Sequence, residues 1–440
     1  MGFLSKQINP TRLLITIFVT FILFGTALLQ LPFATTESVS WLDALFTATS
    51  AMTVTGLAVV DTGTAYTLFG QIVIMCLIQI GGLGIMSFAV LIFIMLGKKI
   101  KFKERIILQQ ALNQTSIGGV IRLVLNLFIF SAIVEGFAVI LLAINWVPEY
   151  GWGKGIYYSV FHSISAFNNA GFSIWSDSLM RYVADPAVNI VISCLFIIGG
   201  LGFTVLADLY YKKSWKAVSL HSKLMIVGTV CINTIAIIVI FALEYNNPDT
   251  IGNLSAGGKI FGAFFQAVSP RTAGFNTIDI GSMEDPSIIF TILLMFIGGG
   301  SASTAGGIKL TTFIVIILAV VTFIKGRDEI KVFRRSIDRT SIFKSLAISM
   351  ISILVIFTAL FILSISEKDA PFIQILFEVV SAFGTVGLSM GITGALSSVG
   401  KLVIILVMII GKLGPLTLVF SLAKKSHVNF KYPKEDILTG

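Results

Sequence analysis

Four short stretches of this sequence combine glycine with oxygen-bearing side chains, a combination that can bind a bare cation. Each ends in Gly followed by Leu or Phe, and they read Thr-Val-Thr-Gly-Leu (53–57), Asn-Asn-Ala-Gly-Phe (168–172), Arg-Thr-Ala-Gly-Phe (271–275) and Gly-Thr-Val-Gly-Leu (384–388). They contain no carboxylate, which a calcium or magnesium site would normally recruit. The residue types therefore favour a hard monovalent cation.

We predict that these stretches form one selectivity filter. Carbonyl groups turned toward a common axis can replace the water shell of a dehydrated ion, and glycine reaches the backbone conformations that this requires. Metal binding is expected at the filter alone. The predicted filter residues are Thr53, Val54, Thr55, Gly56, Asn168, Asn169, Ala170, Gly171, Thr272, Ala273, Gly274, Thr385, Val386 and Gly387.

The composition is that of an all-α polytopic membrane protein. Hydrophobic residues make up 56% of the 440 residues and charged residues only 12%, whereas soluble domains carry about 25% charged residues. Several apolar runs reach the ~20 residues that a bilayer helix needs. They are Leu13–Phe33, Leu68–Gly97, Val188–Ala207, Leu224–Leu243 and Ser345–Ser366.

The four stretches are parts of an internal repeat. Windows 42–57, 157–172, 260–275 and 373–388 superpose without a gap and align one Phe column: Phe46, Phe161, Phe264 and Phe377. A serine column (Ser50, Ser165, Ser381) is broken in the third unit, which has Val268 there and Ser269 at the next position.

Each unit reads as span, short helix, glycine loop and second span. The predicted repeats are 1–105, 106–220, 221–335 and 336–440, which gives eight transmembrane spans and four re-entrant pore helices around one pore per protomer. A short helix of 10–13 residues covers about half a bilayer at ~1.5 Å per residue. Its C-terminal end would point a partial negative charge at the pore centre.

The distribution of basic residues predicts the orientation. The segments 1–12, 97–122, 208–223, 325–344 and 424–440 hold 23 of the 31 Lys and Arg residues. This positive-inside pattern places both termini in the cytoplasm of a multi-pass cell-membrane protein. The net charge of +9 therefore indicates membrane orientation, and no nucleic-acid partner is expected.

A second unusual stretch follows the third glycine loop. As one helix, Ile288–Ile324 would extend about 55 Å, well past a ~30 Å hydrocarbon core, and its glycines would cost roughly 1 kcal/mol each. We predict a break that leaves a gate loop beneath the filter, although a close helix crossing on small residues is an alternative. The gate-loop residues are Gly298, Gly299, Gly300, Ser301, Ala302, Ser303, Thr304, Ala305, Gly306 and Gly307.

Charged residues near the predicted pore need partners. Arg271 would repel a cation, so we expect its guanidinium to point away from the axis and pair with an acid, with Glu378 as a candidate. Lys309 and Lys412 lie within apolar spans, where a charge costs at least ~2.5–3.5 kcal/mol. Each is expected to face a cavity or a carboxylate; Lys309 could instead reach the cytoplasmic surface, and Lys412 could act as an electrostatic barrier below the filter.

These motifs resemble the Trk/Ktr/HKT potassium transporters, and most closely the membrane subunit of bacterial Ktr systems. The resemblance rests on the four loops, on Thr-Val-Thr-Gly-Leu-Ala-Val-Val-Asp-Thr-Gly from position 53, and on Gly-Gly-Gly-Ser-Ala-Ser-Thr-Ala-Gly-Gly-Ile-Lys from position 298. It implies potassium uptake, often sodium-dependent, through a homodimer with one pore in each protomer. It also implies a cytoplasmic nucleotide-binding regulatory ring, a gating role for 298–307, and potassium preference because of Gly56.

Two other classes of membrane protein fit the sequence less well. A secondary transporter with broken helices around an organic substrate usually shows two large repeats, whereas this chain shows four small ones. A membrane enzyme would need a cluster of His, Asp and Glu or of Ser and Lys, and none is visible. The sequence contains no G-x-x-x-x-G-K-[ST] motif, so no cofactor is expected in this chain, and ion gradients would drive transport.

Overall fold

The computed structural model of the chain describes residues 10–84, 87, 120–301 and 303–414. The predicted boundary between the first two repeats, at 105 and 106, lies outside these ranges, as do both chain termini and Ala302. Within the described ranges the chain is almost entirely helical, with one small β-hairpin.

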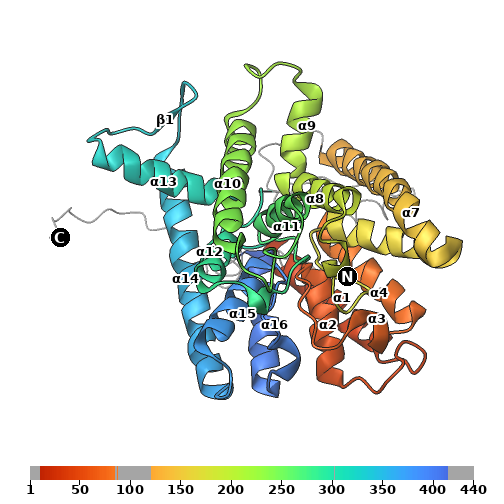
Figure 1. The fold of residues 1–440 in the computed structure, drawn as a ribbon. Coiled ribbons are helices and arrows are strands. Elements are labelled where there is room, and N and C mark those ends of the chain that lie inside the picture. Colours follow the sequence, from red (N-terminus) through yellow and green to blue (C-terminus); the bar gives the residue numbers. More distant parts are fainter. Residues whose placement is uncertain (1–9, 85–86, 88–119, 302, 415–440) are drawn as a thin grey trace, which may run out of the picture.

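We group the helices by the predicted repeats. The first two groups are α1 (Pro10–Leu29), α2 (Trp41–Thr53), α3 (Thr62–Ala65) and α4 (Leu68–Leu83), then α7 (Val120–Phe167), α8 (Pro186–Leu201) and α9 (Phe203–Tyr211). The last two are α10 (Leu220–Glu244), α11 (Ala256–Val268), α12 (Asp285–Phe296) and α13 (Leu310–Ile324), then α14 (Arg339–Ser366), α15 (Phe372–Gly384) and α16 (Ser398–Leu413). In Figure 1 the groups follow one another around the centre of the molecule, from orange through yellow and green to blue.

Among the described residues, four helices are long and apolar enough to cross a membrane: α1, α7, α10 and α14. The count rises to five if α8 and α9, which meet at 90°, form one span. The apolar run Val188–Ala207 is therefore divided between α8 and α9. The chain turns at Gly202, whose φ of 100° is readily available to glycine.

The same turn ends the second long helix of two other groups. Gly84 caps α4 with φ 87° and ψ 131°, and Gly414 caps α16 with φ 84° and ψ 132°. In the third group α12 ends at Phe296 and the next helix, α13, begins at Leu310. The predicted break after the third loop is thus present, and the glycine-rich stretch between these helices is not helical.

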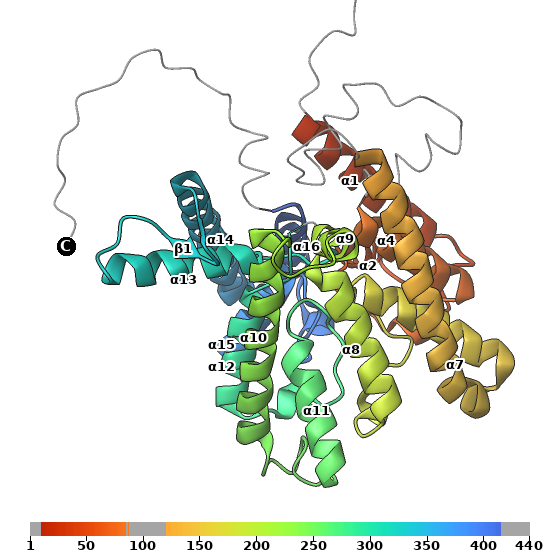
Figure 2. The same cartoon turned by 90° about the horizontal axis from the view of Figure 1, so that it is seen from above.

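A short helix precedes each glycine loop. Three of them, α2, α11 and α15, have 13 residues each. In the second group the short helix is the C-terminal part of α7, after a break at Gly151 (φ 79°), three residues after Pro148. Figure 2 shows the two parts of α7 at an angle to each other. Ser40 caps the N-terminus of α2, because its Oγ accepts from Asp43 N at 3.1 Å.

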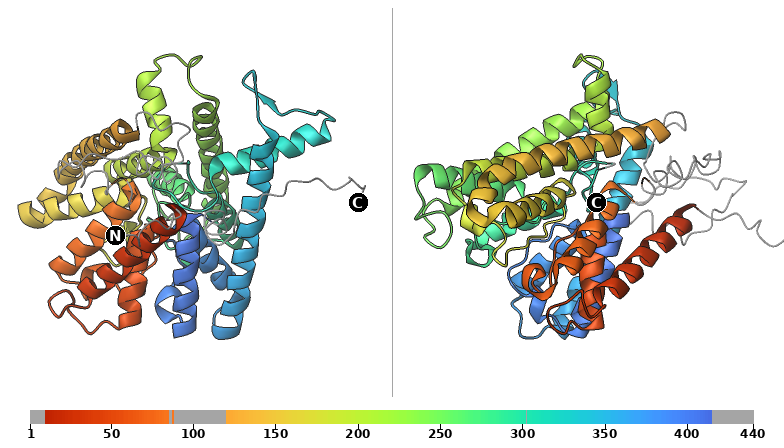
Figure 3. Two further views of the ribbon diagram at one scale, coloured as in Figure 1. Left: turned by 180° about the vertical axis from the view of Figure 1, so that it is seen from behind. Right: turned by 90° about the vertical axis from the view of Figure 1, so that its right-hand side faces the viewer.

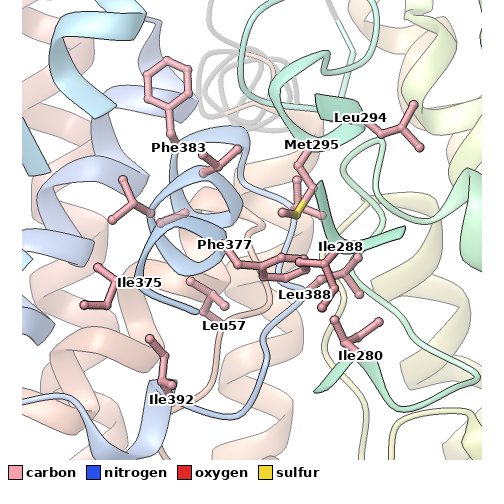
Figure 4. Packing of buried hydrophobic residues seen from close by; sticks show 14 of the residues in the cluster. Leu57, Ile280, Ile288, Leu294, Met295, Ile375, Phe377, Phe383, Leu388 and Ile392 are labelled. Carbon is pink, nitrogen blue, oxygen red and sulfur yellow. The ribbon is translucent and has the colours of Figure 1, made fainter. Parts of the chain in front are cut away.

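The core lies where the short helices meet the second long helices of their groups. Phe377 on α15 is fully buried, and Figure 4 shows it surrounded by Leu57, Ile288 and Leu388 from three different groups. The short helices are therefore fixed by packing across groups, which positions the loops that follow them.

The third group also contributes the part that lies farthest from this core. Figure 3 shows α13 and the β-hairpin extending away from the other helices. The hairpin pairs β1 (Lys331–Val332) with β2 (Arg335–Ser336) in antiparallel register. Phe333 and Arg334 form its turn with φ 49° and 62°, the left-handed pair that suits a two-residue hairpin.

Candidate cation pathway

The four glycine loops form a closed ring in which each loop contacts the next. A Cβ added to any of the four glycines would meet a main-chain oxygen of the following loop, so only glycine fits this approach. The contacts close from the fourth loop back to the first. From the added Cβ they are Gly56 to Ala170 O (2.4 Å), Gly171 to Ala273 O (3.0 Å), Gly274 to Val386 O (2.1 Å) and Gly387 to Thr55 O (2.1 Å).

The backbone of each loop follows one pattern. The residue two places before the glycine is left-handed, although it carries a side chain, and the glycine itself also has positive φ. A non-glycine residue in this region is uncommon, so finding it four times at one position indicates a shared loop geometry. The φ values are 50° at Val54, 58° at Asn169, 75° at Thr272 and 48° at Thr385, and 94°, 67°, 77° and 95° at the glycines.

One serine per loop holds this geometry. Ser50 Oγ accepts from Gly56 N, and Ser381 Oγ accepts from Gly387 N, both at 3.1 Å. Ser165 Oγ donates to Phe172 O at 2.7 Å. In the third loop Ser269 Oγ donates to the corresponding carbonyl, that of Phe275.

The serine contacts correct the gap-free alignment of the third unit. The residue before each filter glycine donates its N–H to the main-chain oxygen of Ser50, Ser165, Ser269 or Ser381. Ser269 therefore takes the serine position that the sequence comparison gave to Val268. Phe265, fully buried, likewise takes the place of the half-buried Phe264. The third loop is one residue shorter than the others.

The second long helices press against the ends of the short helices. An added Cβ would lie about 2 Å from a main-chain oxygen at each such contact, so these glycines are close-packing positions. The pairs are Gly81 with Met52 O (2.0 Å), Gly199 with Phe167 O (1.9 Å) and Gly411 with Phe383 O (2.0 Å).

A polar cavity of about 260 Å³ opens on one side of the ring and is lined by all four filter glycines. Asp61 and Thr393 also line it. Behind it, the buried carboxylate of Glu378 accepts from Ser389 Oγ at 2.7 Å and from Thr393 Oγ1 at 2.5 Å. The four glycines therefore share one polar cavity, which we call the vestibule.

The glycine-rich stretch lies against the loops beneath the ring. An added Cβ on Gly306 would lie 2.1 Å from Thr385 Oγ1. Thr304 Oγ1 donates to Asn169 Oδ1 at 2.9 Å. The stretch is anchored at its base, where Gly298 N donates to Ile308 O at 2.8 Å and Leu310 N to Gly299 O at 3.0 Å. The glycine-rich stretch therefore contacts the second and fourth loops, on the side of the ring where α13 begins.

Arg271 does not pair with Glu378 as expected. Its guanidinium donates to Asn233 Oδ1 on α10 at 2.9 Å, so it points away from the ring, as the sequence analysis anticipated. Within the described residues it forms no ion pair, and its Nε is buried without a partner. Asn233 supplies the polar contact that an acid was predicted to supply.

The two lysines bind main-chain oxygens of the glycine-rich stretch. Lys412 Nζ donates to Thr304 O at 2.5 Å, and Lys309 Nζ donates to Ala305 O at 2.6 Å. Neither lysine contacts a carboxylate among the described residues. These carbonyl groups can accept from the lysines because the glycine-rich stretch is not helical at Thr304 and Ala305.

Sequence reasoning missed one polar chain that supports the second loop. Asn168 Nδ2 donates to Gln79 Oε1 at 2.6 Å, and Gln79 Nε2 donates to both oxygens of Glu135 at 3.2 Å. Glu135, an acid within the apolar α7, thus supports the second glycine loop through Gln79. The signal for this chain was the amide of Gln79, one of the two glutamines within the apolar α4.

The assembled geometry can coordinate a cation with main-chain oxygens. The ring carries no charged side chain toward its axis, and the short helices end at it with their partial negative charges. The hydroxyl of Thr385 is buried beside the ring and has no hydrogen-bond partner in the part of the chain that the structure describes. Such a site suits a dehydrated monovalent cation better than a divalent one.

Comparison with known proteins defines the class. The family model TrkH, described as cation transport protein, matches residues 9–432. The chain belongs to this family, whose members are transporters and not enzymes, and the resemblance read from the sequence is confirmed.

Individual relatives are similar along the whole chain. The Ktr system potassium uptake protein B of Bacillus subtilis is 56% identical over 434 residues, which cover 99% of this chain and 97% of that protein. The potassium/sodium uptake protein NtpJ of Enterococcus hirae is 40% identical over 443 residues, with 99% and 98% coverage. The crystal structure of the potassium transporter TrkH from Vibrio parahaemolyticus has the same fold, with a TM-score of 0.72 at 20% identity, covering 95% of this chain and 86% of that one.

Proposed function

We propose that this chain is the membrane subunit of a potassium uptake system and passes K⁺ along the axis of the glycine ring. The observation that carries the proposal is the closed order of the four loops, each glycine against a carbonyl of the next. Oxygens fixed around one axis can replace the hydration shell of K⁺. The name of the Bacillus subtilis relative, a potassium uptake protein, supports the same ion.

The proposed architecture has eight spans and four re-entrant pore helices. In this arrangement α4, α12 and α16, which are too short to be counted as spans by themselves, belong to the second spans of their groups. Both termini lie in the cytoplasm of the cell membrane, as the basic segments indicate. The vestibule above the ring then faces outward, where the acidic loops attract cations.

The glycine-rich stretch 298–307 acts as the gate in this proposal. It lies directly beneath the ring, and Lys309 and Lys412 hold its carbonyls there. Moving it aside would open the path, and removing either lysine would favour that movement.

The complete system contains further parts. Two copies of this chain form a homodimer with one pore each, and a cytoplasmic nucleotide-binding ring regulates them. Sodium accompanies or promotes potassium uptake, which fits the potassium/sodium name of the Enterococcus hirae relative. No cofactor is required in this chain, since K⁺ and Na⁺ are transported ions.

Cation competition in proteoliposomes tests the filter. The wild type and Gly56→Ser are compared for K⁺ flux in the presence of rising Na⁺. A Cβ at position 56 would lie 2.4 Å from Ala170 O, so the serine variant should lose K⁺ discrimination. Gly136→Ala, at a helical glycine with no atom within 4 Å of the added Cβ, is the matched control. Equal discrimination in Gly56→Ser and the wild type would rule out the filter assignment.

A further inference from the structure

The side chain of Asn169 joins three parts of the molecule that are distant in sequence. Its Oδ1 accepts from Thr304 Oγ1 of the glycine-rich stretch at 2.9 Å, and its Nδ2 donates to Thr272 Oγ1 of the third loop at 3.2 Å. Asn169 itself belongs to the second loop. One amide thus connects the proposed gate with two adjacent filter loops.

This connection is rigid on every side. Asn169, Thr272 and Thr304 each expose 1% or less of their surface. An added Cβ would lie 2.9 Å from Asn169 Oδ1 at Gly199 and 3.3 Å from Asn169 Nδ2 at Gly200. The amide therefore occupies a slot between α8 and the loops, and it cannot rotate without losing both partners.

The backbone at both ends of the connection is left-handed, with φ 58° at Asn169 and 75° at Thr272. Such conformations cost roughly 1–3 kcal/mol for residues with side chains, unless surrounding contacts hold them. The Thr304 and Thr272 hydroxyls provide such contacts at the level of the ring. Withdrawal of Thr304 would leave the buried Asn169 oxygen unpaired, which is costly.

We propose that Asn169 is a positioning residue that couples the gate to the filter. With the glycine-rich stretch in place, Thr304 fixes the Asn169 amide, and the amide fixes the second and third loops. When the stretch moves aside, the amide loses its donor and these loops relax, so ion preference depends on the position of the gate. The inference rests on the proposed gating role of 298–307.

Substitution of Thr304 separates this coupling from gating alone. Thr304→Val keeps the branched shape but removes the hydroxyl that binds Asn169, and Thr304→Ser keeps a hydroxyl. Ser303→Ala is the matched control, because Ser303 Oγ contacts only Gly300 O and Ala305 N of its own stretch. K⁺ flux and the K⁺/Na⁺ flux ratio are measured for each variant in proteoliposomes, and folding is checked by thermal unfolding.

Thr304→Val should raise K⁺ flux and lower the K⁺/Na⁺ ratio by about three- to ten-fold, the effect of one hydrogen bond, while Thr304→Ser should restore the ratio. Thr272→Val should lower the ratio, and combining it with Thr304→Val should add little because the connection is already broken. The coupling would be overturned if Thr304→Val raised the K⁺ flux but kept the wild-type K⁺/Na⁺ ratio, as expected for Ser303→Ala. It would also be overturned if the effects of Thr272→Val and Thr304→Val on the ratio were strictly additive. Failure of the proposed function gives a different result: no selective K⁺ flux in the wild type, or no change in flux for any variant of the stretch.

Discussion

Lys401 Nζ lies 2.6 Å from Asp43 Oδ1, although the two residues are 358 positions apart in the chain. Lys401 is on α16 of the fourth group, and Asp43 is in the first turn of α2 in the first group. The side chains are 15% and 18% exposed, so the pair is only partly screened by solvent. It ties the last group to the first at the N-terminal end of α2.

Breaking this pair should destabilise the whole ring. Lys401→Met leaves Asp43 without its cation, and we expect the free energy of unfolding to fall by about 1–3 kcal/mol, between the values for surface and buried pairs. Chemical unfolding in detergent micelles measures it. Asp43→Asn and the double variant complete a cycle, in which a coupling energy near zero would show that the contact is not stabilising.

The register of the third loop can be tested with two adjacent residues. Ser269→Ala removes the hydroxyl that binds Phe275 O, so the third loop should loosen and the K⁺/Na⁺ flux ratio should fall several-fold, as with Ser165→Ala. Val268→Ala should leave the ratio near the wild-type value, since that side chain packs against neighbouring helices. A larger fall in the flux ratio for Val268→Ala than for Ser269→Ala would instead support the gap-free alignment, in which Val268 takes the serine position.

The lysine contacts predict the direction of a gating change. Lys412→Met and Lys309→Met each remove a donor to a carbonyl of the glycine-rich stretch. A hydrogen bond from a charged group contributes about 1.5–3 kcal/mol, so each variant should raise the K⁺ flux about ten-fold or more. Lys325→Met, at an exposed lysine just after α13, serves as the control. Tracer flux that falls or stays unchanged in both variants would contradict this role.

Glu367 gives a pH-dependent contribution to stability outside the spans. Burial acts to raise the pKa of Glu367. The carboxylate accepts hydrogen bonds from the side chain and amide of Ser397 and from the Ser366 hydroxyl, and these hold its pKa below the ordinary value of 4.5. A carboxylate with a lowered pKa stabilises the fold above its ordinary value, and the contribution is lost as pH falls. The wild type should therefore unfold at a higher temperature than Glu367→Gln near pH 7, and the gap should shrink below pH 4.5. A gap that does not change with pH would exclude this contribution.

The fold class and the positions of the four loops were readable from the sequence because both leave local signals. Apolar runs mark spans, and the repeated Gly-Leu or Gly-Phe pairs mark loops that pack alike. The turn at Gly202 was missed because a glycine inside an apolar run looks the same whether it packs or bends. The shift at Ser269 was missed because a single deleted residue is hard to detect in a short alignment. The hydrogen bonds of Ser269 and the burial of Phe265 reveal it.

The partners of the charged residues were also not predictable, because they are neutral groups that leave no local signal in the sequence. Reasoning from charge gave Arg271 an acidic partner, whereas the structure gives it the neutral Asn233. Lys309 and Lys412 likewise found main-chain oxygens, which every residue has and no sequence pattern marks. The amide of Asn169 was predicted as an ion ligand, and its contacts across three segments depend on folded geometry alone.

The ring also constrains how this chain can change over evolutionary time. Each glycine abuts an oxygen supplied by the following loop, so a substitution in one loop is felt first by its neighbour in a fixed direction around the axis. The four loops therefore cannot diverge independently, even though they are more than 100 residues apart in the chain. Covariation among related sequences should therefore link each loop to the next, including the fourth to the first, and should be weakest between loops on opposite sides.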